Sequence, residues 1–254
     1  MVAKVPQVTL LFWIIKILAT TLGETGGDAV TMSWLGETTA EANGSGYLIG
    51  TAIFGVIFFV AVLVQIRAKN FHPFLYWLTI VATTTVGTTL ADYCTRSLGI
   101  GYTGGSAILL VLVIASLVIW RWSTGSISID TVNTPKVEIF YWLTIMFSQT
   151  LGTALGDWVA DTNGMGYVGA AAVFGGLLLL TAILYYATGI SRALLFWSAF
   201  ILTRPLGAVV GDFLDKPIAQ GGLHLSRYTA SLALLVVIVL LIAIFPQKPA
   251  VKAH

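Results

Sequence analysis

Four aspartates recur at one fixed position in four apolar segments of this chain. Each segment opens with an aromatic residue and a Trp, has a Gly ten residues after the Trp, and has the Asp five residues after that Gly. The four acids are Asp28, Asp92, Asp157 and Asp212. Ionisable residues inside apolar segments are costly and usually functional, and carboxylates suit Na⁺, H⁺, Mg²⁺, Ca²⁺ or Mn²⁺ better than Zn²⁺ or Cu⁺. The structural alternative is that each aspartate holds the turn that follows its helix.

Other polar residues of these segments occur only once. Glu24 lies one helical turn before Asp28, where the other three segments have Thr or Ala. Lys16 and Arg204 also lack charged counterparts, and Gln149 occupies the offset of Arg204 in its own segment. A buried salt bridge between Glu24 and either Lys16 or Arg204 would explain these charges structurally. We favour a role in translocation or ion binding, because the other segments fold without such charges.

The four segments open four tandem repeats, at about residues 8–66, 72–122, 137–188 and 192–245. Their shared signature contains Trp13, Trp77, Trp142 and Trp197, and Gly23, Gly87, Gly152 and Gly207. A second apolar run follows each signature and is long enough to cross a hydrocarbon core of about 30 Å. The pattern predicts an all-α integral membrane protein with a single membrane domain over residues 1–254. Its eight transmembrane helices would form four parallel two-helix repeats.

The two helices of each repeat differ in polarity, and this difference predicts where each lies. The second run is almost wholly apolar and suits a position against lipid. The first run carries small residues four apart, which allow close backbone packing, beside a stripe of polar residues. Because unsatisfied polar groups in lipid are costly, this stripe must face protein or water. We therefore expect the first helices to be inner, packed through their glycines, and the second helices to be outer.

Composition and charge exclude a soluble protein and a nucleic-acid partner. Hydrophobic residues make up 57% of the chain and charged residues only 9%, so its solvent is the lipid bilayer. The net charge of +2 comes without a basic stripe. Lys and Arg are concentrated on the side of the termini and of the loops between repeats. The positive-inside rule therefore predicts that both termini are cytoplasmic.

The repeat signature resembles that of a bacterial membrane-protein family known as the repeat of unknown function. Members of this family carry four tandem repeats, each with two transmembrane segments and a characteristic tryptophan. The matching residues are Trp13, Trp77, Trp142 and Trp197, and the resemblance extends from about Val8 to Phe245. It implies a multi-pass protein of the bacterial inner membrane, and it implies no particular activity.

The function has to be predicted from the polar residues. No metalloprotease pattern, nucleophile elbow, Walker loop or nucleotide fingerprint occurs, so we expect no catalytic residue and no cofactor beyond a bound cation. We predict a transporter or ion-conducting protein that moves a small solute or cation between the first helices. Glu24 would provide proton or cation coupling, and Lys16 and Arg204 would gate the path. The alternative is a non-transporting scaffold or assembly factor, with an intramembrane enzyme a distant third. No motif specifies an oligomeric state.

Overall fold

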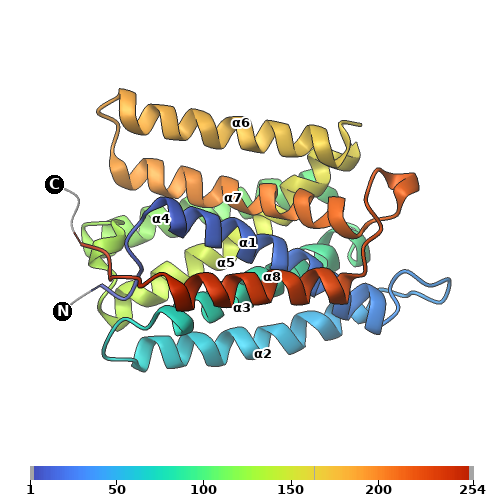
Figure 1. Ribbon diagram of the computed structural model, residues 1–254, viewed down its shortest axis with the longest axis horizontal. Helices are drawn as coiled ribbons and strands as arrows, with labels where there is room; N and C mark the ends of the chain where they lie inside the picture. Colours follow the sequence, from blue (N-terminus) through green and yellow to red (C-terminus); the bar gives the residue numbers. More distant parts are fainter. Residues whose placement is uncertain (1–2, 163, 252–254) are drawn as a thin grey trace.

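The computed structural model describes residues 3–162 and 164–251, which form eight long α-helices (Figure 1). The first helices of the repeats are α1 (Leu10–Asp28), α3 (Pro73–Asp92), α5 (Pro135–Asp157) and α7 (Arg192–Asp215). The second helices are α2 (Ser45–Arg67), α4 (Gly101–Thr124), α6 (Gly166–Ala187) and α8 (Arg227–Ile244). These ranges contain no β-strand, so the prediction of an all-α protein is confirmed.

Five short helical turns complete the described chain. Three are π-helical and directly continue a first helix: η1 (Ala29–Trp34), η2 (Tyr93–Ser97) and η4 (Trp158–Thr162). Two are 3₁₀ turns in connecting segments: η3 (Ile129–Thr131) and η5 (Ile218–Gln220). The α-helical part therefore ends at the signature aspartate in the first three repeats, whereas α7 continues past Asp212 to Asp215.

Local sequence explains where the first helices begin. Thr9 caps α1, because its hydroxyl accepts a hydrogen bond of 3.4 Å from the backbone N–H of Phe12. Pro73 and Pro135 begin α3 and α5, where the missing N–H of proline removes no helical hydrogen bond. Pro205 instead lies inside α7, where it leaves a backbone carbonyl without its usual donor.

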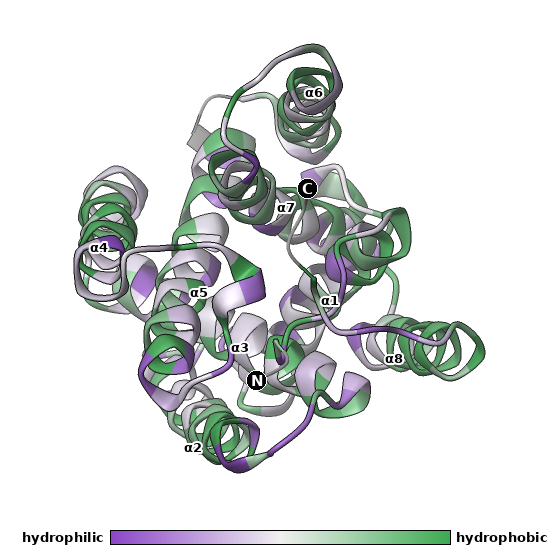
Figure 2. Cartoon of the chain, turned by 90° about the vertical axis from the view of Figure 1, so that its left-hand side faces the viewer, coloured by the Kyte–Doolittle hydropathy of each residue, from purple (hydrophilic) through white to green (hydrophobic). Residues whose placement is uncertain are grey.

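The four first helices form a closed inner ring, and the second helices lie outside it (Figure 2). Around the ring, α1 packs on α3, α3 on α5, α5 on α7, and α7 again on α1. Each outer helix packs on the inner helix of the following repeat: α2 on α3, α4 on α5, α6 on α7, and α8 on α1. The two helices of one sequence repeat are therefore not close packing partners. Neighbouring repeats interlock, and the last repeat closes on the first.

The signature glycines set the spacing of this ring. A Cβ atom on Gly87 would lie 2.9 Å from the Cβ of Gln149 in the next helix, closer than real Cβ contacts. A Cβ on Gly156 would lie 3.2 Å from the Cβ of Ala208. All around the ring, the residue three positions before a signature glycine packs against the signature glycine of the preceding inner helix. The pairs are Gly23–Thr84, Gly87–Gln149, Gly152–Arg204 and Gly207–Thr20. Small residues thus let polar side chains enter the ring, as expected for close helix packing.

The aromatic residues of the signature pack at the end of the bundle that holds both chain termini, which we call the tail end (Figure 1). The aromatic residue before each Trp contacts the Trp of the next repeat, and the fourth repeat contacts the first. The pairs are Phe12–Trp77, Tyr76–Trp142, Tyr141–Trp197 and Phe196–Trp13, with ring centroids 5.4, 5.7, 6.0 and 5.8 Å apart. The signature tryptophans therefore join repeats through a cyclic aromatic cluster, which closes the ring at this end.

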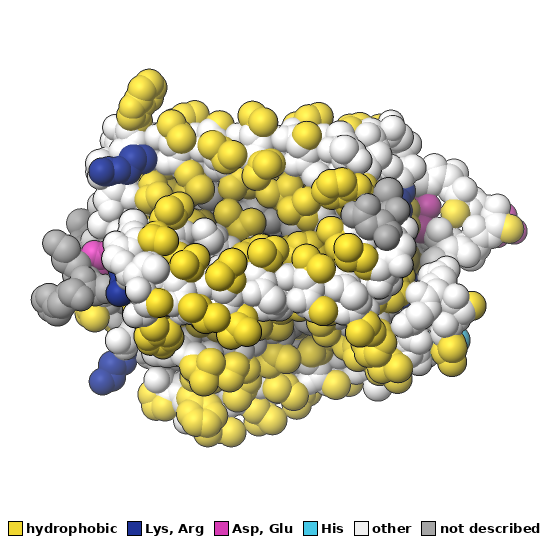
Figure 3. All heavy atoms as spheres, turned by 90° about the horizontal axis from the view of Figure 1, so that it is seen from above, with side chains coloured by type: hydrophobic (Ala, Val, Ile, Leu, Met, Phe, Trp, Pro, Cys, Tyr) yellow, Lys and Arg dark blue, Asp and Glu magenta, His cyan; other side chains and the backbone are white. Residues whose placement is uncertain are grey.

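The outer surface is largely apolar along the helices. Hydrophobic side chains cover the length of the face shown in Figure 3, and lysines and arginines gather mainly near the left-hand tail end. Seven helices are long and apolar enough to cross a membrane, counted over the described residues. α5 is not among them, although eight spans were predicted. Its sequence explains this result, because Lys136, Glu138, Gln149 and Asp157 lower its hydropathy.

Candidate functional site

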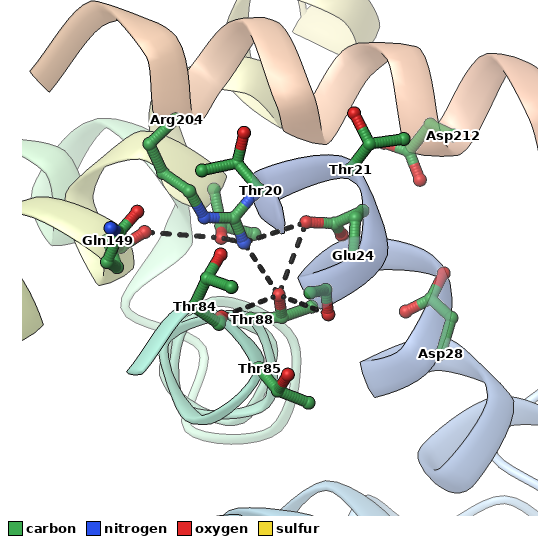
Figure 4. A network of polar contacts seen from close by, with 12 residues as sticks. Thr20, Thr21, Glu24, Asp28, Thr84, Thr85, Thr88, Gln149, Arg204 and Asp212 are labelled. Atoms are coloured by element: carbon green, nitrogen blue, oxygen red, sulfur yellow. Dashed lines mark hydrogen bonds and ion pairs between the residues drawn. The ribbon is translucent and has the colours of Figure 1, made fainter. Parts of the chain in front are cut away.

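One guanidinium group joins all four inner helices at the centre of the ring (Figure 4). Arg204 of α7 is fully buried. Its Nη2 donates hydrogen bonds to Glu24 Oε2 of α1 at 2.9 Å, to Thr88 Oγ1 of α3 at 2.6 Å, and to Thr153 Oγ1 of α5 at 2.5 Å. We call these four residues the central cluster. Of the two partners considered for Glu24, the structure pairs it with Arg204 and not with Lys16.

The repeat explains how this cluster forms. Glu24, Thr88 and Thr153 occupy the same offset in their repeats, so their side chains reach one level of the ring from three helices. Arg204 lies one turn earlier in α7 and packs against Gly152, where any side chain would collide with it. A long side chain at this offset can therefore extend across the ring to its neighbours. Thr88 Oγ1 also lies 3.3 Å from Glu24 Oε2, so Thr88 contacts both charged residues of the central cluster.

The four signature aspartates form a second level, at the end of the bundle opposite the tail end. We call them the aspartate ring and this end the aspartate end. All four are almost completely buried: Asp28, Asp92, Asp157 and Asp212. They lie one helical turn beyond the level of Glu24. Two cations from the chain cross-link the aspartates in pairs, and each cation comes from the segment that directly follows one of the two aspartates.

Each of these cations joins two neighbouring inner helices. Arg96 of η2 lies 2.8 Å from Asp92 and 3.2 Å from Asp157. Lys216, directly after α7, lies 3.0 Å from Asp212 and also contacts Asp28. Each cation follows its own aspartate by four residues and reaches the aspartate of the next helix. Sequence reasoning missed both residues, although the four-residue spacing in repeats two and four was the signal that could have revealed them.

The carboxylates around Lys216 keep its side chain positively charged. Burial alone would lower the pKa of Lys216, but Asp212, Asp28 and Asp215 outweigh burial and raise this pKa well above its usual range. The Lys216 ammonium therefore remains positively charged at neutral pH. A competing cation can reach Asp28 and Asp212 only if it displaces this side chain.

Acids outnumber bases in this region of the described chain. Six buried carboxylates contact four cations. The acids are Glu24, Asp28, Asp92, Asp157, Asp212 and Asp215; the cations are Arg96, Arg204, Lys216 and Arg227. Glu24, Asp28 and Asp212 each offer a carboxylate oxygen, and these three atoms lie within 4.8 Å of one another. Hard oxygen ligands of this kind fit a proton or a hard cation.

A cavity of about 720 Å³ opens at the aspartate end next to these ion pairs. Its lining includes Arg96, Asp215, Lys216 and Arg227, together with parts of η1 and of the segment 216–226. That segment folds back on the end of α7, where the N–H groups of residues 223 and 225 donate to the carbonyls of residues 213 and 214 at 2.7 and 2.8 Å. Water therefore has a route from this end to the cations of the aspartate ring.

The tail end is closed by both terminal segments. The ammonium of Lys4 lies 2.6 Å from the fully buried Glu138 of α5. The backbone N–H of Ala250 donates to the carbonyl of Val5 at 2.7 Å. Trp77 Nε1 donates to Gln247 Oε1 at 2.8 Å, which ties the C-terminal segment to the aromatic cluster. Both segments therefore cover the aromatic end of the inner ring.

Two candidates from the sequence lie between the central cluster and the aromatic cluster. Lys16 and Gln149 are fully buried and take no part in the ion pairs of the aspartate ring. The Lys16 ammonium lies 4.2 Å from the centre of the Phe200 ring. Signature residues Trp77, Trp142 and Trp197 are nearly fully buried in the aromatic cluster, whereas Trp13 is only partly buried.

Comparison with known families identifies the repeat. The family described as Repeat of Unknown Function matches residues 11–71, 75–126, 140–191 and 195–246, which together make up most of the chain. The resemblance inferred from the tryptophan signature is thereby confirmed. No curated protein and no solved structure gave a significant match.

Proposed function

Since this chain belongs to the Repeat of Unknown Function family, whose description states no activity, we propose from its own side chains that it is a membrane transporter or ion-conducting protein. It moves a small solute or cation along the axis of the inner ring, coupled to a proton or cation. All eight helices span the bacterial inner membrane as four parallel repeats. The tail end faces the cytoplasm, and the basic residues near that end support this orientation.

The observation that carries the proposal is the set of buried charged residues along the axis of the inner ring. The central cluster, the aspartate ring and the residues paired with them place six buried acids beside four cations where helices meet. Burying charges is costly even in pairs, and well-packed apolar residues often replace such pairs without loss of stability. A bundle that serves only as a scaffold has no need of this arrangement. A conducting path requires it, because a translocated ion must exchange its water for protein oxygens.

The two ends of the axis support a path closed on one side. The cavity at the aspartate end reaches Arg96 and Lys216. The aromatic cluster and the terminal segments cover the tail end. A solute entering from the aspartate end would meet the aspartate ring first, then the Glu24–Arg204 pair. This order assigns initial binding to the aspartates, and gating to Arg204.

Glu24→Gln is the variant that tests the proposal. It keeps the shape of the side chain but removes the charge that the repeat does not require, since Thr or Ala stands there in the other repeats. Uptake of a panel of radiolabelled ions is measured in proteoliposomes of wild type, Glu24→Gln and the exposed control Glu41→Gln. We expect the first variant to abolish wild-type uptake and the control to retain it. Wild-type vesicles that take up no member of the panel above protein-free vesicles would count against the proposal.

The scaffold alternative is favoured by one observation. Arg96, Arg204 and Lys216 each tie together neighbouring inner helices, as structural ion pairs would. In a scaffold, Glu24→Gln leaves the Arg204 charge unpaired and lowers stability without changing any transport. Neutralising Arg204 in the same protein would then restore stability. Thermal unfolding is therefore recorded on the same preparations used for uptake.

A further inference from the structure

Directly on the tail side of the central cluster, buried polar atoms from all four inner helices have no hydrogen-bond partner among the described residues. They are Lys16 Nζ of α1, Thr84 Oγ1 of α3, both amide atoms of Gln149 of α5, and Nε and Nη1 of Arg204 of α7. We call these four residues the donor layer. Lys16, Gln149 and Arg204 are fully buried, and so is Thr84. Neither the ion pairs nor the aspartate ring accounts for them.

Three of these side chains belong to one level of the bundle. Thr84, Gln149 and Arg204 share one repeat offset, and each packs against a glycine of the preceding helix. Figure 4 shows Thr84 and Gln149 beside the guanidinium of Arg204. Lys16 lies one turn nearer the tail end on α1, and its ammonium lies 4.2 Å from the centre of the ring of Phe200, which comes one turn before Arg204 on α7. By their positions along the inner helices, the unpartnered atoms therefore lie between the central cluster and the aromatic cluster.

Most of these unpartnered groups are hydrogen-bond donors. Lys16 offers three N–H donors, Arg204 has donors left on two nitrogens, and Gln149 adds its amide N–H groups. Lys16 and Arg204 are both cationic side chains, and Glu24 pairs with Arg204 but not with Lys16. The Phe200 ring replaces only part of the hydration that the Lys16 ammonium has lost. A group that fits this surplus accepts hydrogen bonds and carries negative charge.

We propose that the donor layer binds a small anion, a halide or a carboxylate group, between Lys16 and Arg204, with Gln149 and Thr84 as further ligands. The anion balances the charge of Lys16 and saturates donors that the chain leaves unpaired. This site goes beyond the proposed function, because it holds whether or not the ring transports a solute. It lies on the opposite side of Arg204 from the acids that would bind a cation.

Anion-dependent stability tests the site directly. Purified protein is unfolded by heat in chloride, in acetate and in gluconate, at constant ionic strength and constant sodium. The unfolding temperature of the wild type should rise by a few degrees for each tenfold increase of chloride or acetate, because ligand binding to the folded state stabilises it. A response to chloride alone identifies a halide site, and a response to acetate alone identifies a carboxylate site.

Lys16→Met locates the effect, since it keeps an unbranched side chain and removes the charge. It should abolish the anion response, whereas the exposed control Lys136→Met should keep it. An equal unfolding temperature of the wild type in all three salts would overturn the proposal. So would a Lys16→Met protein that responds as the wild type does.

A second measurement does not depend on how the variant folds. Wild-type crystals grown in bromide should show anomalous scattering from an ion between Lys16 and Arg204. Water molecules alone at that place, both in crystals that hold bromide elsewhere and in crystals grown in acetate, would mean that the donor layer is a hydrated region with an uncharged Lys16, and the proposal would be wrong.

Discussion

At the scale of single residues, the fold depends on side chains that occur once in a repeated framework. Thr or Ala satisfies the offset of Glu24 in three repeats, and Thr or Gln satisfies that of Arg204. The pair thus adds charge to positions where the two-helix unit needs none. Because Arg204 contacts three other helices with one nitrogen, it is the residue whose loss affects the whole ring.

Replacing Arg204 with Met should therefore be strongly destabilising. The variant leaves the Glu24 carboxylate buried without its cation, and breaking a buried pair in this way costs about 3–5 kcal/mol. The double variant Arg204→Met/Glu24→Gln should recover much of this loss, because no charge is then left unpaired. Unfolding free energies of both variants are compared with that of Arg121→Met, an exposed arginine on α4. Additive losses in the double variant would show that the two side chains do not interact.

At the scale of helices, the glycine pattern controls how closely the inner helices approach. Gly156 of α5 faces Ala208 and the carbonyl of Pro205 on α7, and a Cβ there would already lie 3.2 and 3.3 Å from these atoms. Gly175 of the outer helix α6 has open space around its Cβ position. The two glycines therefore permit one substitution to be compared in two settings.

Gly156→Leu should disrupt the α5–α7 contact, whereas Gly175→Leu should be tolerated. Overpacking a tight contact typically costs about 1–3 kcal/mol, and more where a backbone lies in the way, as here. An outer helix with open space around the added side chain can accept it at little cost. Thermal unfolding in detergent measures both variants. Equal stability of the two would contradict the assignment of α5 to the inner ring.

The sequence predicts where the helices lie along the chain better than it predicts which helices pack together. An aromatic–Trp, Gly and Asp at constant spacing identifies a repeat, and the apolar periodicity indicates which face of a helix is buried. Neither tells which helix covers that face. The packing of α2 on α3, rather than on α1, depends on tertiary contacts that a linear pattern does not encode. The same limit explains why the sequence marked Glu24 as unusual without deciding its partner, and why it did not show that Arg96 and Lys216 reach the aspartate of the next helix.

At the scale of the whole molecule, the two ends of the ring differ. The aspartate end has charged residues beside an open cavity, and the tail end has tilted and edge-on aromatic rings beneath two paired terminal segments. Trp77 links these two parts of the tail end, because its indole N–H bonds Gln247 in the C-terminal segment. Access from the tail end to the donor layer therefore requires the terminal segments to separate from the aromatic cluster.

Removing the Trp77–Gln247 bond should loosen this closure. Val5 is nearly fully buried where the two terminal segments pair, so a cysteine in its place should react slowly with a water-soluble maleimide. In a Cys94→Ser background, Gln247→Ala should increase the labelling rate of Val5→Cys several-fold, because the C-terminal segment loses its anchor on the ring. Lys248→Ala changes the adjacent exposed residue and should leave the rate as it was. Rates that are equal in both variants would mean that the Val5–Ala250 backbone contact alone holds the tail end closed.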